Sequence, residues 1–195
     1  MPTINNPVVY SAIALDKIAE VQREPGFNHT RWGDADLEYV RCEIRDFYRR
    51  EQRLSCVYCR EQIAVRSAAS APVEHIVPRS RYLQFMFEPK NLCVVCADCN
   101  EFKSNREVLT DPPLTGNPIR TYPTDPHRYR LFHPHFDEYR EHIIKAGFLY
   151  VENSRKGGHT IYVCNLNRFV QTFGVSDEFM NSLETLTDME RFHRN

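Results

Sequence analysis

The stretch NLCVVCADCNEFK, residues 91–103, joins an apolar run to a pair of cysteines and then to residues that favour a helix. Residues 91–95 have the apolar character of a short buried strand. A helix is expected to begin near Ala97 and to run to about Leu109. The pair Cys96 and Cys99 therefore lies at the junction of a strand and a helix.

A second cysteine pair with the same two-residue spacing, Cys56 and Cys59, lies upstream of the first. This spacing lets both thiolates of a knuckle face one ion, and two such knuckles complete the four-thiolate site that structural zinc prefers. The alternatives are buried core cysteines or a redox pair. Cys93 and Cys96 also have the required spacing, but Cys93 alternates within the 91–95 strand and reads as a small core residue. The same core assignment applies to Cys42 and Cys164.

The cellular compartment decides whether these cysteines would form disulfides or bind a metal. No apolar run approaches the length of a membrane-spanning helix, and the first 17 residues, MPTINNPVVYSAIALDK, lack the basic segment of a signal peptide. A cytoplasmic location is expected, where disulfides are disfavoured and zinc is the better explanation for the cysteines. The formal net charge is −1, so a nucleic-acid partner would have to meet a local basic patch rather than a globally basic protein.

Between the two cysteine pairs lies Glu74-His75, in a strand expected over residues 73–77 that ends before Pro78. A single histidine in an apolar run is more often a hydrogen-bonded core residue than a catalyst. Adjacent strand residues point to opposite faces, so a bulge or a strand end is needed for Glu74 and His75 to serve one site.

The order of these features resembles the zinc-bound HNH endonucleases. The resemblance covers residues 55–105, about a quarter of the chain, and implies an α+β fold with a treble-clef-like ββα-metal core. The motifs that carry it are Cys56-x-x-Cys59, Glu74-His75-Ile76-Val77-Pro78, Asn91-Leu92 and Cys96-x-x-Cys99-Asn100-x-x-Lys103.

The resemblance also implies roles for four residues. His75 would be the general base that activates water, and Glu74 and Asn100 would bind one catalytic ion. Their hard oxygen ligands suit Mg²⁺ or Mn²⁺ rather than zinc. Asn91 would brace the loop between the strands. This sequence has Glu74 where the family more often has Asp, so the longer side chain reaches the ion directly or through a water. Removal of the structural zinc is expected to unfold the site.

Basic residues surround this motif, and phosphate contacts require such a local patch. Lys103, Arg79 and Arg81 are the candidates for nucleic-acid binding, and Lys103 is the best supported because it follows Asn100 by one helical turn. The function expected is a metal-dependent endonuclease that acts on nucleic acid, most simply DNA. An RNA-directed nuclease and an inactive zinc-organised binding module are the alternatives.

The flanks are expected to pack with the core as one domain. Residues 1–53 predict two helices, one over residues 8–22 with Ile13, Ile18 and Val21 inward, and one that ends near Arg53, capped by Asp34 or Asp36. Residues 54–110 form the core. Residues 111–195 begin with a proline-rich connection. They continue with an expected helix over 134–148, a hairpin over 148–164 that turns at Gly157-Gly158, and helices over 165–174 and 176–192.

Several histidines lie outside the motif. His133, His135, Asp137 and His142 could form a second metal site. The simpler interpretation is that this segment packs on the core with its polar groups hydrogen-bonded.

The flanks place N-terminal helices before the core and the stretch KGGHTIYVCNLNRF, residues 156–169, with C-terminal helices after it. This layout, and the TI…LNR part of that stretch above all, is similar to small bacterial HNH proteins of anti-phage systems, of the retron-associated and Septu type. That resemblance implies an ATPase partner protein. The sequence is also compatible with a homo-oligomer of this chain.

Overall fold

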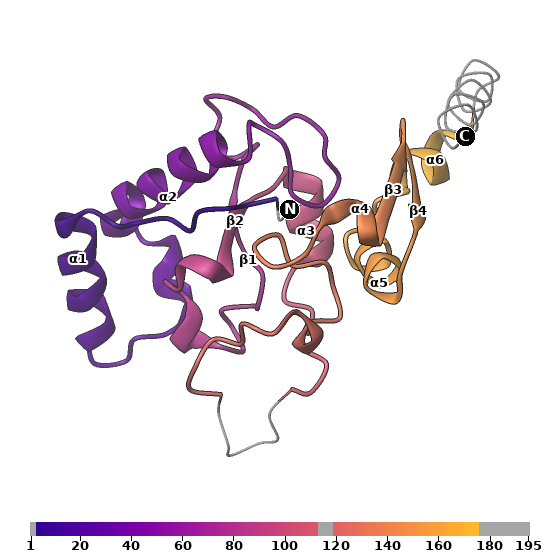
Figure 1. Ribbon diagram of the computed structural model, residues 1–195. Coiled ribbons are helices and arrows are strands. Elements are labelled where there is room, and N and C mark those ends of the chain that lie inside the picture. Colours follow the sequence, from indigo (N-terminus) through magenta and orange to yellow (C-terminus); the bar gives the residue numbers. More distant parts are fainter. Residues whose placement is uncertain (1–2, 113–118, 176–195) are drawn as a thin grey trace.

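The computed structural model describes residues 3–112 and 119–175. Figure 1 shows three parts that lie side by side in chain order. The first holds helices α1 (Ala12–Arg23) and α2 (Glu38–Glu51). The second holds a small hairpin and a helix, and the third holds a second hairpin with three short helices. The buried apolar side chains of all three parts form one contiguous cluster.

Helix α1 begins later than expected. Its first turn is capped by Ser11, whose hydroxyl accepts a hydrogen bond from the Ala14 amide at 3.2 Å. The prediction of a start near residue 8 was wrong because the chain there is extended, and the Val8 amide donates to the Tyr48 hydroxyl at 3.1 Å. The inward positions of Ile18 and Val21 are confirmed, whereas the side chain of Ile13 is 72% exposed.

Helix α2 buries Val40, Ile44 and Tyr48, which follow helical spacing, and it packs against the central hairpin. Two short 3₁₀ helices, η1 (His29–Gly33) and η2 (Ala35–Leu37), precede it. Neither Asp34 nor Asp36 caps α2, so that prediction was wrong. The carboxylate of Asp36 instead pairs with cationic side chains of α1 and η1.

The central hairpin pairs β1 (Val73–His75) with β2 (Leu92–Val94) in antiparallel register, with Glu74 opposite Cys93. Two 3₁₀ turns, η3 (Leu83–Phe85) and η4 (Pro89–Asn91), lie in the connection between them. Strand β1 ends at His75, two residues before the predicted end at residue 77. His75 pairs with Leu92 and is the last residue of the ladder, so this histidine lies at a strand end, as a shared site with Glu74 requires. Helix α3 (Ala97–Lys103) follows β2. It stops six residues before the predicted end, because Ser104 adopts a positive φ of 46° that a helix cannot continue.

The third part differs most from expectation. After η5 (Pro126–Arg128), helix α4 spans only Tyr139–His142 and leads directly into β3 (Ile143–Ala146), which pairs with β4 (Leu149–Glu152). The helix predicted over 134–148 and the hairpin predicted over 148–164 were therefore misplaced. The hairpin turns at Gly147, whose φ of 56° suits a tight connection. Helices α5 (Arg155–Val163) and α6 (Arg168–Phe173) follow. The predicted helix over 176–192 lies outside the described residues.

Gly157 and Gly158 thus lie in helix α5 rather than at a turn. At position 157 a residue without a Cβ atom is required, because α5 approaches the end of α4 closely. A Cβ atom built on Gly157 would lie 1.7 Å from the backbone oxygen of His142. On Gly158 it would meet only the carboxylate of the Glu152 side chain, which can move away. The close approach of two backbones therefore requires glycine at position 157 alone.

Replacing Gly157 with alanine is expected to lower the free energy of unfolding by about 3 kcal/mol, since the backbone of α4 or α5 must shift. The matched change Gly158→Ala is expected to stay within about 1 kcal/mol of the wild type, because alanine favours a helix and offsets the side-chain displacement. Urea denaturation of both variants measures the difference. Equal stability of the two variants would contradict the close packing of α5 on α4.

In residues 3–112 and 119–175, the structure contains no helix with the length and apolar character needed to span a membrane.

Candidate active site

Four cysteine side chains converge at the junction of the central and C-terminal parts. The Sγ atoms of Cys56, Cys59, Cys96 and Cys99 all lie within 4.8 Å of one another, and those of Cys59 and Cys96 are 3.7 Å apart. Four thiolates at about 2.3 Å from one tetrahedral zinc ion would lie roughly 3.8 Å apart. The cluster therefore has the size and the ligand set of a structural zinc site, as the spacing predicted.

The local chain conformation explains how the first knuckle forms. The Arg60 amide donates to the Cys56 carbonyl at 3.0 Å, and Arg60 itself has a positive φ of 60°. The Cys56 amide donates to the Glu61 carbonyl at 2.9 Å, which closes the turn. In the second knuckle, the Cys99 amide donates to Cys96 Sγ at 3.4 Å at the start of α3. Cys93 and Cys164 are buried away from the cluster, in agreement with their assignment as core residues.

Glu74, His75 and Asn100 line one open pocket of about 430 Å³. Strand β1 supplies the first two, and the position after Cys99 on α3 supplies the third. The pocket wall also contains residues that the sequence did not link to the site. The full lining is His29, Glu74, His75, Pro78, Arg79, Ser80, Asn100, Glu101, Ser104 and Asn105.

The His75 ring is held by its Nε2 atom, which lies 3.0 Å from the carbonyl oxygen of Met86. Because a carbonyl only accepts, Nε2 carries the proton, and the lone pair of the neutral ring is on Nδ1. Trp32 packs edge-on against the ring at a centroid distance of 4.5 Å. Burial, and then the neighbouring Arg79, lower the pKa of His75 well below its usual value, so the ring is neutral at pH 7.

Comparison with known proteins identifies this region. The family model of the HNH endonuclease matches residues 56–106. Residues 56–106 are the HNH endonuclease domain that this match supports. None of the curated proteins compared with the chain matches it, and no solved structure does so either.

Within the HNH domain, Asn91 makes the bracing contacts that the resemblance implied. Its side-chain oxygen accepts from the Val77 amide at 2.7 Å, and its side-chain nitrogen donates to the carbonyl oxygens of Val77 and Phe85 at 3.1 and 2.9 Å. The side chain is fully buried. Asn91 therefore fixes the chain that leaves β1, and with it the position of His75, but it does not line the pocket.

Lys103 does not have the position expected for a phosphate contact. Its side chain is fully buried, and its ammonium group forms an ion pair with Glu74 Oε1 and donates to the His75 carbonyl at 2.9 Å. The position of Lys103 does not support the predicted contact with nucleic acid, because α3 turns this residue inward, toward β1. Burial raises the pKa of Glu74, and the charge of Lys103 opposes that rise.

Replacing Lys103 with methionine is expected to destabilise the HNH domain by about 3–5 kcal/mol, because Glu74 would be left buried without its cation. The double variant Glu74→Gln with Lys103→Met should recover much of this loss, since the uncompensated charge disappears. Lys90→Met, on the same domain but half-buried, is the matched control. Chemical denaturation measures all three, and a Lys103→Met variant within 1 kcal/mol of the wild type would contradict the ion pair.

Of the two arginines predicted to bind nucleic acid, Arg79 lines the pocket and Arg81 contacts a residue of its rim. Arg79 lines it, with Nε donating to the His29 carbonyl at 3.2 Å and Nη1 3.4 Å from His75 Nδ1. Arg81 is exposed beside it and donates to the Asn105 carbonyl at 3.1 Å. Unlike Lys103, neither arginine is fully buried: Arg79 lines the pocket, and Arg81 is exposed but is not part of the pocket lining.

The histidines of residues 133–142 have structural partners. The His133 ring lies 2.9 Å from the Tyr122 hydroxyl, and the His135 ring lies 2.8 Å from the Leu92 carbonyl. Asp137 pairs with Lys156 at 2.6 Å. Among the described residues only the four cysteines form a metal-binding group. The packing interpretation is thus favoured over a second metal site.

Proposed function

We propose that this chain is a metal-dependent endonuclease that hydrolyses phosphodiester bonds of DNA. The observation that carries the proposal is the pocket in which Glu74, His75 and Asn100 meet. The HNH family match implies a nuclease, and the pocket supplies the groups that phosphodiester hydrolysis requires.

The base in this proposal is His75, acting through Nδ1. The Met86 carbonyl holds the proton on Nε2, so Nδ1 is the atom that accepts a proton from water. The water oxygen then forms a bond to phosphorus as the bond to the leaving oxygen breaks. Because its pKa is lowered, His75 is already neutral at pH 7 and needs no prior deprotonation.

Glu74 and Asn100 are the residues that would hold a Mg²⁺ or Mn²⁺ ion. A carboxylate and an amide oxygen are hard donors that suit these cations. Lys103 engages Oε1 of Glu74, and we assign Oε2 to the ion. When bound, the ion supplies charge neutralisation at the phosphate and at the leaving oxygen.

The substrate backbone would be held by Arg79 and Arg81. Arg79 now lies against the nitrogen assigned as the base. A phosphate that draws the guanidinium toward itself would leave Nδ1 open to water, so that substrate binding uncovers the base. Arg81 would add a second phosphate contact at the exposed rim.

The test compares supercoiled plasmid, single-stranded DNA and transfer RNA, each incubated with the zinc-loaded protein and Mg²⁺ or Mn²⁺. Cleavage of plasmid with little cleavage of RNA is the result expected. Cleavage of RNA alone would assign the enzyme to RNA, and cleavage of none would favour a zinc-organised binding module.

The cellular role we propose is anti-phage defence in a bacterial cytoplasm, together with an ATPase partner. Only the layout of the flanks supports this role. Co-purification of the chain with the product of the neighbouring gene, followed by a mass measurement, tests the partner.

A further inference from the structure

The thiolate cluster has a cationic neighbour from outside the HNH domain. Arg168, on helix α6, places Nη2 3.8 Å from Cys96 Sγ and Nη1 3.9 Å from Cys99 Sγ. Its Nε atom donates to Asp98 Oδ2 at 3.0 Å. The HNH family match ends at residue 106, so the family pattern does not include this arginine.

The contact of Arg168 with the sulfur atoms matters because a zinc ion bound by four thiolates carries a net negative charge. Four thiolates around one Zn²⁺ ion carry a formal charge of −2. A guanidinium group that donates to two of the sulfur atoms offsets part of this charge. Groups that hydrogen-bond to the side chains that bind a metal usually have a strong influence on the affinity for that metal.

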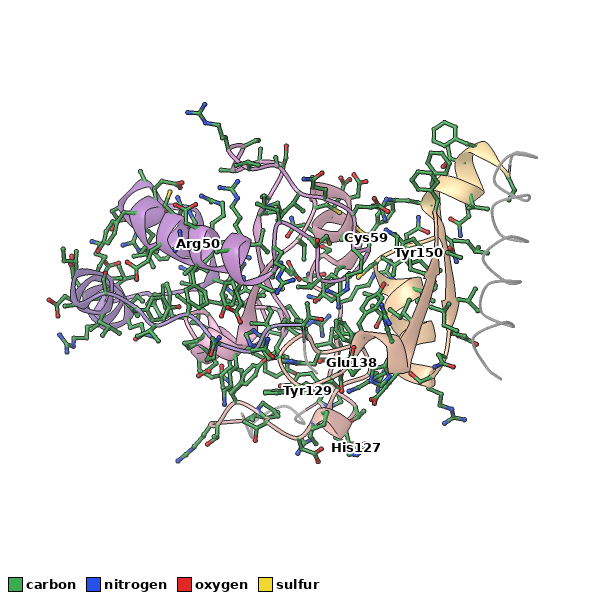
Figure 2. All side chains as sticks on the ribbon, turned by 45° about the horizontal axis from the view of Figure 1, so that its top comes forward. Arg50, Cys59, His127, Tyr129, Glu138 and Tyr150 are labelled. Carbon is green, nitrogen blue, oxygen red and sulfur yellow. The ribbon has the colours of Figure 1, made fainter. Side chains whose placement is uncertain are left out.

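The same part of the chain also contacts the other cysteine knuckle. The Tyr150 hydroxyl, on β4, donates to the Cys59 carbonyl at 2.5 Å, and the Tyr139 hydroxyl donates to the Tyr58 carbonyl at 2.9 Å. Figure 2 labels Cys59 and Tyr150, which lie close together where the central and C-terminal parts meet. Lys145 pairs with Glu61 at 2.6 Å, at the end of the knuckle.

We propose that residues 139–173 form a clamp on the zinc site, in which Arg168 positions and neutralises the thiolates of the second knuckle while Tyr150 fixes the first. In this arrangement zinc binding and docking of the clamp stabilise each other. The inference goes beyond nuclease activity, and it holds or fails independently of whether the protein cleaves DNA.

Competition for zinc with a chromophoric chelator tests the clamp on the full-length, zinc-loaded protein. Arg168→Gln is expected to weaken zinc binding by about 10- to 100-fold, and Arg168→Lys by less, because a lysine keeps the charge but not the two-pronged donor. Arg155→Gln, at an exposed position of α5, is the matched control and should bind zinc as the wild type does. Asp98→Asn separates the sulfur contacts from the Arg168–Asp98 ion pair and should have little effect.

Tyr150→Phe provides a second route to the same test, because it removes one hydroxyl and keeps the ring. A loss of about fivefold in zinc affinity is expected from the missing hydrogen bond. Hydrogen exchange of zinc-loaded Arg168→Gln should show faster exchange in β4 and α6 than in α1. Zinc affinities within twofold of the wild type for both Arg168→Gln and Tyr150→Phe would overturn the proposal. Equal weakening by Asp98→Asn and Arg168→Gln would overturn the role of the sulfur contacts.

Discussion

Replacing His75 with alanine is expected to reduce the rate of DNA cleavage at least 100-fold, and up to about 10,000-fold, the range that a positioned general base contributes. The reason is that the hydrogen bond to the Met86 carbonyl keeps the proton of His75 on Nε2. The lone pair of Nδ1 is therefore left to accept a proton in the pocket. Initial rates of plasmid nicking at saturating Mg²⁺ or Mn²⁺ measure the effect.

The alanine variant also removes a ring that packs against Trp32, so a loss of stability must be separated from a loss of catalysis. His75→Gln fills most of the space and can still donate to Met86. It is expected to lose activity to a similar degree while its zinc content stays at the wild-type level. His127→Ala, on the exposed turn η5, is the matched control and should cleave normally. A His75→Gln variant that keeps more than about a tenth of the wild-type rate would contradict the assignment of the base.

Removing the structural zinc is expected to unfold the HNH domain. Its hairpin has only three residues in each strand, and α3 has seven residues. Elements this short do not persist alone in water. In small zinc-bound domains the apparent free energy of metal binding is about 10 kcal/mol or more, and it is in effect the free energy of folding.

The measurement is a thermal melt followed by circular dichroism, on Cys56→Ala and on the wild type treated with a strong zinc chelator. Both are expected to lose the cooperative transition of the central part. Cys93→Ala is the matched control, because Cys93 is buried in β2 next to the site but outside the cluster, and it should cost only about 1 kcal/mol. A wild-type melt for Cys56→Ala would contradict the role of zinc as the scaffold.

The zinc site could be predicted because its signal is local. Two cysteine pairs with a fixed spacing encode two knuckles, and four thiolates suit few metals other than zinc. The same holds for β1, β2 and the start of α3, which follow from short apolar runs beside the knuckles. Their ends were less predictable: β1 stops at His75, and α3 stops at Lys103 because Ser104 adopts a positive φ, which no local pattern signals.

The C-terminal part was predicted poorly for a different reason. Residues 139–152 contain residues that suit a helix, but Ile144 pairs across the hairpin with Val151, and this tertiary pairing determines the conformation. The Gly157-Gly158 pair is a strong turn signal in a sequence, yet here Ser154 caps a helix and accepts from the Gly157 amide at 3.1 Å. The requirement for glycine arises from the His142 backbone, which no local pattern reveals.

The candidate site shows the same division. The sequence placed Glu74, His75 and Asn100 in one motif, and the structure brings them to one pocket. It did not indicate that Lys103 turns inward, nor that His29 and Trp32 from η1 would reach the site. Those contacts join segments far apart in the chain, and a single sequence carries no signal for them.

The most direct test of the central claim is the rate of plasmid cleavage by the zinc-loaded wild type as Mg²⁺ or Mn²⁺ is titrated, with zinc content determined in the same samples. The account predicts cleavage that rises and saturates with the added ion while zinc stays at one per chain. Absence of cleavage at every ion concentration, or an equal rate when the added ion is withheld, would contradict it.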